Sequence, residues 1–340
     1  MATIREVAKR AGVAPITVSR VLNSPDTVAE QTRERVEQAI RDLKYVPNML
    51  GQGLRHKRTH TVGLVIPDIR NPYYVPTILA VEAVAREQGY DVLLVNTDGR
   101  ADLESRQLRN LVARRVDGIV LAPIYNTPDS VDFIQGQHIP VCVLDYAMPN
   151  NQVDVVRCDT LTAARELTTY LLQLGHRSLR MMTGPQDIVT ARERAEGYVQ
   201  AIEAFGLDVA DNPVNYGSFD PVQSRIDARP LLDVASPPTA VVTASNFIAL
   251  GAAHAALDLG WEIPGDLSIV TFDGPASELV LQPFFTCAET PAYEIAERAA
   301  TLLLQRIHSP RSTQVSDVVL SAKLAFNLST AAPVTQGAAR

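Results

Sequence analysis

The apolar positions of the first 46 residues recur at helical spacing, which predicts three helices, over about residues 4–10, 15–23 and 30–43. Thr3 and Glu6 have the types and spacing of a capping box, in which each side chain satisfies a backbone N–H group of the other. Gly12 supplies a turn, and Pro15 suits the first helical position because its missing N–H costs nothing there. Two helices joined by a short turn and braced by a third are typical of a helix-turn-helix domain, whose second helix enters the DNA major groove.

The second predicted helix has one apolar and one polar face. Val18, Val21 and Leu22 form the inward stripe. The opposite face carries residue types that bind bases and phosphates, namely Thr17, Ser19, Arg20 and Asn23. The alternative interpretation is a small three-helix packing module without a ligand.

Beyond about residue 59 the pattern changes to short apolar runs that alternate with amphipathic stretches. Strands are predicted over residues 62–66, 92–95, 118–121, 141–144, 153–158, 179–182, 240–243 and 267–272. Helices are predicted between them over residues 74–88, 103–114, around 133, 161–174, 191–205, 225–232, 247–259 and 293–307. Strands that are apolar along their whole length indicate parallel sheets covered by helices on both faces. So long a series predicts two doubly wound α/β lobes.

Charge divides the chain at the same place. Residues 1–60 contain 11 Lys+Arg and 6 Asp+Glu, whereas the remainder contains 20 Lys+Arg and 32 Asp+Glu. A basic head on an acidic body indicates that the head alone meets a polyanion such as DNA.

Several classes of protein are excluded by what the sequence lacks. No apolar run is long enough for a membrane span, and the first ten residues lack the apolar stretch of a secretory signal, so we expect a cytoplasmic protein. Cys142, Cys158 and Cys287 have neither metal nor disulfide spacing and are expected to be buried thiols. Without a Rossmann glycine motif, a P-loop, a nucleophile elbow or paired histidines, we expect no enzyme, cofactor or metal. A free solute-binding protein would share the two lobes but leave the basic head unexplained.

Ligands of doubly wound sheets bind beyond the carboxyl ends of the strands. Polar and aromatic residues follow the predicted strands at positions 68–74, 123–125, 145–146, 190–194, 218–219, 245–246, 273 and 289. Carboxylates there can accept hydrogen bonds from hydroxyls, Arg194 can donate to them, and Phe219 or Tyr73 can stack on a ring. This mixture suits a sugar or a nucleoside. The plainer alternatives are a helix cap for Asp273, a turn for Asp145, a solvated Arg194 and a core position for Phe219.

Two segments of the head are distinctive together, Val-Ser-Arg-Val-Leu-Asn at residues 18–23 and Tyr-Val-Pro-Asn at residues 45–48. With these segments, residues 2–48 resemble the DNA-binding domain of the lactose/galactose repressor family. The resemblance implies that bases are read by Pro15, Ile16 and Arg20. It also implies that phosphates are bound mainly by Thr17, Ser19 and Asn23.

The resemblance further implies a hinge over residues 47–58 that becomes helical on DNA. Leu54 would wedge into the minor groove, with Arg55 beside it as a further DNA contact. Gly51 and Gly53 depart from the family pattern, and each disfavours a helix by about 1 kcal/mol. Ala14 stands where a serine would cap the second helix, a loss of about 1 kcal/mol.

For the body, the resemblance implies a core similar to periplasmic sugar-binding proteins, with the effector between the lobes. We expect lobe 1 at about residues 59–159 and 290–316, lobe 2 at about 160–289 and 317–330, and a frayed tail at 331–340. The predicted effector site combines family positions with strand-end positions: Tyr73, Tyr74, Asp145, Thr190, Arg194, Phe219, Ser245, Asp273 and Glu289. The family usually has Asn-Asp where this chain has Ser245-Asn246, so the effector itself does not carry over.

The sequence therefore predicts a homodimeric, allosteric transcriptional regulator, most simply a repressor. Its parts would be an all-α helix-turn-helix head at 1–46, the hinge at 47–58, and the two-lobe α/β core at 59–330, which binds effector and dimerises. A two-fold dimer requires a near-palindromic double-stranded operator. The small polar effector, a sugar first and a nucleoside or purine next, would alter operator affinity by shifting the lobes. No membrane partner is expected.

Overall fold

The computed structural model describes residues 2–46, 58–125, 128–146, 148, 153–274, 283–309 and 314–334. The chain forms two compact units, Met1–Thr59 and His60–Arg340. The predicted hinge contacts Leu54 and Arg55, the hinge glycines Gly51 and Gly53, and residues 335–340 of the expected tail lie outside the described residues.

The first unit is a three-helix head around one small apolar core. Its elements are α1 (Ile4–Ala11), α2 (Pro15–Asn23), the 3-10 turn η1 (Pro25–Thr27) and α3 (Glu30–Leu43). Val7, Val18 and Val36, one from each helix, are fully buried together. Their burial fixes which face of α2 points outward.

The helix ends in the head agree with the local sequence signals. Thr3 N donates to Glu6 Oε2 at 2.7 Å, and Glu6 N donates to Thr3 Oγ1 at 3.3 Å, which completes the capping box. Gly12 has a left-handed backbone conformation (φ 66°), which glycine adopts without a steric penalty. The N-cap of α2 is Ala14, whose methyl group cannot cap the helix.

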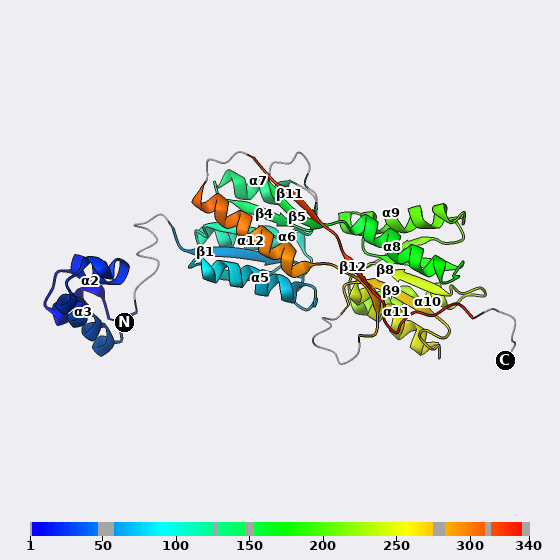
Figure 1. Cartoon of the computed structure of the whole chain (residues 1–340), viewed down its shortest axis with the longest axis horizontal. Helices are drawn as coiled ribbons and strands as arrows, with labels where there is room; N and C mark the ends of the chain where they lie inside the picture. The colour runs from blue at the N-terminus through cyan, green and yellow to red at the C-terminus, as the bar shows by residue number, and fades with distance from the viewer. Residues whose placement is uncertain are drawn as a thin grey trace. The chain divides into compact units, whose positions relative to one another are not determined.

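The second unit contains two α/β lobes, each built on its own sheet (Figure 1). The lobe 1 sheet has the order β11-β5-β4-β3-β1-β2, and its strand pairs are parallel. Its strands are β1 (Thr61–Ile66), β2 (Asp91–Asn96), β3 (Gly118–Leu121), β4 (Val141–Leu144), β5 (Asp154–Cys158) and β11 (Asp317–Leu320). One face packs on α5 (Tyr74–Glu87) and α12 (Ala292–His308), and the other on α6 (Ala101–Ala113) and α7 (Asp129–Gly136).

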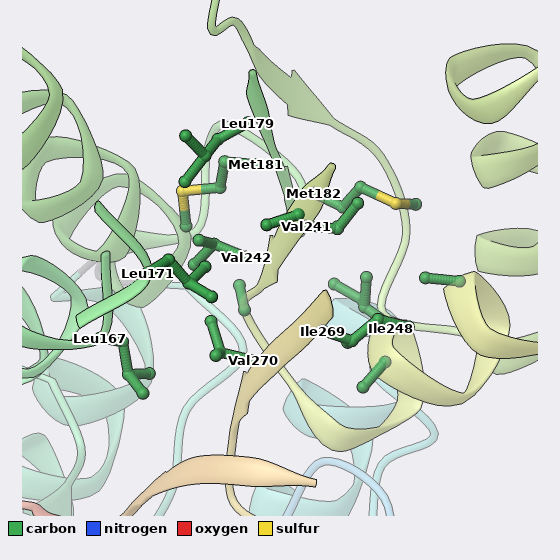
Figure 2. Close-up of a cluster of buried hydrophobic side chains, with 14 of the residues drawn as sticks. Leu167, Leu171, Leu179, Met181, Met182, Val241, Val242, Ile248, Ile269 and Val270 are labelled. Atoms are coloured by element: carbon green, nitrogen blue, oxygen red, sulfur yellow. The ribbon is translucent and has the colours of Figure 1, made fainter. Parts of the chain in front are cut away.

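The lobe 2 sheet has the order β12-β10-β9-β8-β6-β7, with β12 antiparallel to β10. Its strands are β6 (Leu179–Thr183), β7 (Val214–Tyr216), β8 (Ala240–Thr243), β9 (Ser268–Phe272), β10 (Thr286–Glu289) and β12 (Lys323–Ala325). The helices are α8 (Thr160–Gln173) and α9 (Val189–Ala204), then α10 (Pro221–Leu232) and α11 (Asn246–Asp258). Figure 2 shows Met181 on the side of α8 and Met182 on the side of α11, so both sheet faces are covered. The predicted fold class is confirmed.

One predicted lobe boundary is wrong. The crossover was expected near Ser316, but β11 (Asp317–Leu320) pairs with β5 in the lobe 1 sheet. Val318 and Leu320 pack on the lobe 1 core, and Asp317 pairs with Arg157 at 3.1 Å. These contacts hold the segment in lobe 1, so after α12 the chain returns to the lobe 2 sheet only at β12.

The sequence pattern also missed the short elements. The strands β7, β10, β11 and β12 have three or four residues each and include polar or charged residues, so they lack the continuous apolar run that predicts the equally short β3 and β4. Helix α10 begins earlier than predicted because Asp220 caps it, accepting from Val222 N and Gln223 N, and Pro221 follows the cap. The three cysteines are buried free thiols, as expected. No helix in the described part of the chain combines the length and apolarity needed to cross a membrane.

Candidate DNA-binding face and effector cavity

The outward face of α2 carries the residues predicted to contact DNA. The described head leaves all of them at least partly accessible, namely Pro15, Ile16, Thr17, Ser19, Arg20 and Asn23. Ile16 is 46% exposed, an unusual position for an isoleucine in a small domain, and its methyl groups can contact a thymine methyl. Asn23 Nδ2 donates to Ser19 O at 2.8 Å, so in this state the Asn23 amide is held by its own helix.

A cavity of about 370 Å³ is lined by residues of both lobes of the second unit. It brings together these predicted effector residues: Tyr73, Tyr74, Asp145, Thr190, Arg194, Phe219, Ser245 and Asp273. They lie after β4 and β9, in the segment before α10, and at or near the first turns of α5, α9 and α11. This edge is where doubly wound sheets bind ligands.

Glu289 is not among the described residues that line the cavity. It ends β10, opposite Lys323 of β12, and its side chain is exposed while Ala288 before it is buried. Successive side chains of a strand point to opposite faces, so Thr290 lines the cavity in place of Glu289. Asn71 and Asn246 were among the strand-end positions but not in the predicted effector site, and both line the cavity. The sequence reasoning did not select several other lining residues: Cys158, Thr160, Ile188, Phe247 and Thr290. Thr290 follows β10, a strand that the sequence did not predict, so the strand-end rule could not select it. Cys158 is the last residue of the correctly predicted β5, and a rule that collected polar and aromatic residues passed over its thiol.

Two half-buried aspartates approach the cavity, one from each lobe. Asp145 follows β4 and Asp273 follows β9, and both have a left-handed backbone conformation, with φ of 66° and 54°. Asp145 Oδ1 accepts from the Tyr73 hydroxyl at 2.6 Å, and Asp273 Oδ1 accepts from Thr290 N at 3.1 Å. Burial raises the pKa of Asp145 to about 6, and burial also raises the pKa of Asp273. Each carboxylate is therefore held in a low-dielectric wall.

Arg194 supplies positive charge inside this wall. Its guanidinium donates to the Ala244 carbonyl and lies 4.0 Å from the centre of the Phe272 ring, a cation–π contact. Its charge also opposes the burial that raises the pKa values of Asp145 and Asp273. The cavity therefore contains charged side chains from both lobes, Asp145 from lobe 1 and Asp273 and Arg194 from lobe 2.

Unpaired polar atoms in the cavity wall are ready for a ligand. Within the described residues, Arg194 Nε and Asn246 Oδ1 are buried without a hydrogen-bond partner. Such a buried group costs about 1–3 kcal/mol. A ligand that supplies an acceptor to Arg194 and a donor to Asn246 recovers this energy. The geometry therefore favours a ligand rich in hydroxyl groups.

The Phe219 ring packs directly against the backbone of Gly184, which has no side chain. A Cβ atom on Gly184 would collide with the Phe219 ring, so only glycine at the end of β6 permits this packing. The ring packs against core residues of both lobes. Its position at the cavity makes it available to a flat or ring-shaped ligand.

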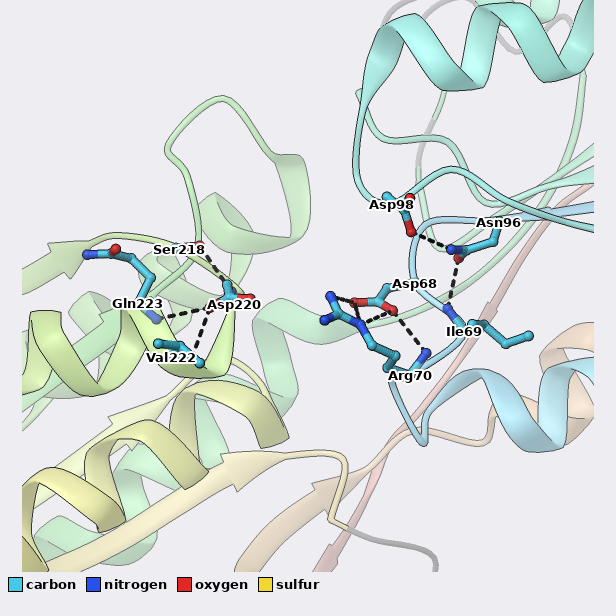
Figure 3. A network of polar contacts seen from close by, with 9 residues as sticks. All are labelled: Asp68, Ile69, Arg70, Asn96, Asp98, Ser218, Asp220, Val222 and Gln223. Carbon is cyan, nitrogen blue, oxygen red and sulfur yellow. Dashed lines mark hydrogen bonds and ion pairs between the residues drawn. The ribbon is translucent and has the colours of Figure 1, made fainter.

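Direct contacts join the lobes around the cavity. Asn246 Nδ2 of lobe 2 donates to Asn71 Oδ1 of lobe 1 at 3.1 Å. Ile188 and Val189, at the start of α9, pack into the lobe 1 core. Figure 3 shows the cavity rim, with Asp68, Arg70 and Asp98 on the lobe 1 side and Ser218 and Asp220 on the lobe 2 side. A change in the relative position of the lobes would alter all of these contacts.

A three-helix head with a polar recognition face, joined in one chain to a two-lobe receptor, defines the class of ligand-responsive DNA-binding regulators. Residues 3–48 match the family described as bacterial regulatory proteins, lacI family. Residues 59–330 match periplasmic binding proteins and sugar binding domain of LacI family. The chain belongs to the LacI family of transcriptional regulators. This family is one of regulators and not of enzymes, which confirms that expectation.

Known proteins resemble the chain along nearly its whole length. The ribose operon repressor of Escherichia coli (strain K12) is 33% identical over 316 residues, which are 92% of this chain and 96% of the relative. A solved complex of the transcriptional regulator CelR with cellobiose is 30% identical, with a TM-score of 0.72, and covers 97% of this chain and 100% of its own. The Lac repressor dimer bound to operator and the anti-inducer ONPF has a TM-score of 0.83, covering 97% of this chain and 99% of its own. At 23% identity that last likeness supports the fold alone.

Proposed function

We propose that this protein is a cytoplasmic repressor that works as a homodimer on a near-palindromic operator and whose operator affinity changes when a sugar occupies the interlobe cavity. The observation that carries the proposal is the cavity itself, in which two half-buried aspartates, one from each lobe, converge with Arg194 and its unpaired Nε. The bacterial DNA-binding family supports action in the cytoplasm, where the DNA is. The dimer and operator of the Lac repressor complex support the assembly by analogy of fold.

We assign operator recognition to α2. Pro15, Ile16 and Arg20 would contact base edges, because α2 is the helix that a helix-turn-helix domain inserts into the major groove. Thr17, Ser19 and Asn23 would contact phosphates, and Asn23 would first exchange its bond to Ser19 for one to DNA. Leu54 and Arg55, in the hinge outside the described residues, complete the proposed DNA contacts.

A sugar fits the donors and acceptors of the cavity. The carboxylates of Asp145 and Asp273 can each accept from neighbouring hydroxyls, and Arg194 Nε can donate to a ring or hydroxyl oxygen. The names of two similar proteins, a ribose operon repressor and a regulator in complex with cellobiose, support this class. A nucleoside or purine is the second candidate, since the aromatic rings of Tyr73, Tyr146 and Phe219 line the same cavity and can stack on a base.

Effector binding would act on DNA through the two lobes. A ligand that hydrogen-bonds residues of both lobes stabilises one relative orientation of the lobes over others. The ligand shifts the equilibrium only by the difference in its affinity for the two orientations. Thermodynamic linkage then requires that operator DNA alter effector affinity by the same factor.

The proposal is tested by operator selection combined with a ligand screen. The full-length protein is used to select from random duplex DNA, and a thermal-shift screen of sugars, nucleosides and purines identifies binders, because a ligand that binds only the native state raises Tm. We expect a selected sequence with two-fold symmetry whose affinity changes when a binder is added. Selection of no sequence, with and without every binder, would contradict the proposal.

A further inference from the structure

Acidic residues outnumber basic residues in the effector cavity. Among the described residues that line it, five are aspartates and two are arginines: Asp68, Asp98, Asp145, Asp220 and Asp273, and Arg70 and Arg194. Neither lysine nor histidine occurs in that described lining. The formal balance is therefore negative, both at the rim and in the buried wall.

Both arginines already have anionic or polar partners. Arg70 forms a two-bond pair with Asp68, at 3.0 Å from Nε to Oδ1 and 2.8 Å from Nη2 to Oδ2. The negative charges of Asp68, and further off of Asp220 and Asp98, raise the pKa of Arg70. Arg194 donates to the Ala244 carbonyl, lies over the Phe272 ring and faces the charges of Asp145 and Asp273. Its unpaired Nε can still donate one hydrogen bond, but its positive charge is already offset by the two aspartates. Neither guanidinium is a spare counter-charge for an anionic ligand.

Helix N-termini do not reverse this balance. The N-terminus of α10 is capped by Asp220, and that of α11 by Ser245, which accepts from Ile248 N at 3.3 Å. Among the described residues, no side chain caps α5 or α9. Each free N-terminus is equivalent to about half a positive charge. Together they fall short of the surplus of aspartates, so the cavity stays negative.

The acceptor atoms of the cavity wall indicate that the ligand must carry hydrogen-bond donors rather than an anionic group. Asn246 is 4% exposed, and its free Oδ1 requires a donor such as a hydroxyl or an amine. The half-buried carboxylates of Asp145 and Asp273 also accept hydrogen bonds from donors. An added phosphate or carboxylate group would bring acceptors and negative charge to a wall that already has both.

We propose that the effector is a polyhydroxylated molecule without an anionic group, an unphosphorylated sugar or nucleoside, and that this cavity rejects its phosphate or its acid. The inference rests on the proposed function, because it concerns the same cavity. The selectivity comes from the aspartates of the wall and rim. Like charges repel strongly where water is excluded, so a phosphate dianion loses its solvation without gaining a free cation.

A cysteine placed at the rim measures the charge of the cavity without knowledge of the effector. We would introduce Ser218→Cys at the rim and Ser236→Cys, a matched control, at an exposed surface position of lobe 2. Rates of modification by cationic and anionic methanethiosulfonates of similar size are compared, after subtraction of the slow reaction of the buried native thiols. We expect the ratio of cationic to anionic rates to be about tenfold higher for Ser218→Cys than for Ser236→Cys. Adding Asp220→Asn and Asp98→Asn should bring the ratio toward the control.

Matched ligand pairs test the same inference by binding. Thermal shifts are measured for ribose and ribose 5-phosphate, glucose and glucuronic acid, and adenosine and its 5′-phosphate. We expect a shift only from the uncharged member of a pair. A larger shift from the anionic member, or equal rate ratios at the two cysteines, would overturn the inference. Absence of any operator response to every ligand would instead contradict the proposed function, and the cysteine ratios would still decide the charge of the cavity.

Discussion

The head and the body of this chain use opposite physical environments for recognition. The head displays the candidate residues of α2 on a solvated helix face, where charges act through contact with a polyanion. The body holds Asp145, Asp273 and Arg194 half-buried in the cavity wall, where partial removal of water raises the pKa values of the carboxyl groups. A surface site tolerates loss of a single contact. In the cavity, removal of one charged side chain leaves its partners unpaired away from water, which is costly, so ligand binding there depends on each of them.

The largest predicted effect is the loss of effector affinity on substitution of Asp273 in the cavity wall. Asp273→Ala removes a carboxylate that no neighbour can replace, so effector affinity should fall about 100-fold, while operator affinity without effector stays unchanged. Isothermal calorimetry measures the first quantity and fluorescence anisotropy with labelled operator the second. The control is Asp211→Ala, at an exposed position in the same lobe, which should leave both affinities intact. Equal behaviour of the two variants would remove Asp273 from the site.

A single contact of the head should matter less. Arg20→Ala should weaken operator binding by about 1–3 kcal/mol and relax the base preference at one position of each half-site. Arg35→Ala, exposed on α3, serves as the comparison and should leave base preference unchanged. Binding to a set of single-base operator variants distinguishes the two. Unchanged discrimination in Arg20→Ala would show that Arg20 does not read a base.

The pH dependence of effector binding should follow the Asp145 carboxyl group. The groups that act on it are Tyr73, which donates to it, Asp273 and Arg194, while burial raises its pKa to about 6. Since hydroxyl donors need the ionised form, effector affinity should fall about tenfold between pH 7.5 and pH 5. Asp145→Asn should flatten this profile. An affinity that rises as pH falls would contradict the assignment.

The same shift has the opposite sign for the stability of the empty protein. A carboxyl whose pKa is raised on folding binds protons more readily in the folded state, so its contribution to stability is lost as the pH rises through about 6. The Tm of the ligand-free protein should therefore decrease less between pH 5 and pH 7 in Asp145→Asn than in the parent. This comparison isolates Asp145 from the other titrating groups.

The smallest predicted effect lies at the start of α2. Ala14→Ser should add the missing cap and stabilise the first turn of α2 by about 1 kcal/mol. Hydrogen exchange of the amides of Thr17 and Val18 in the full-length protein would detect slower exchange. Ala14→Val, which cannot cap, should not slow it. No difference between the two variants would mean that other contacts already order this turn.

The contrast between head and body also explains which site residues could be predicted from the sequence. All residues of the α2 face lie within one helix, so a period of 3.6 residues was enough to group them. The cavity residues come from strand ends far apart in the chain, and they could be grouped only where the strand was predicted. Glu289 was misassigned because β10 was not recognised, and without a strand the alternation that directs Thr290 inward was unknown. The Asn71–Asn246 contact depends on how the lobes meet, which no local pattern encodes.

The central claim, that the cavity controls DNA binding, is tested most directly by a closed linkage cycle. The Kd of the selected operator is measured with and without saturating effector, and the Kd of the effector is measured with and without saturating operator. We expect both ratios to differ from one and to be equal, because the two sites share one coupling free energy. An operator Kd that does not change when the cavity is fully occupied would contradict the account.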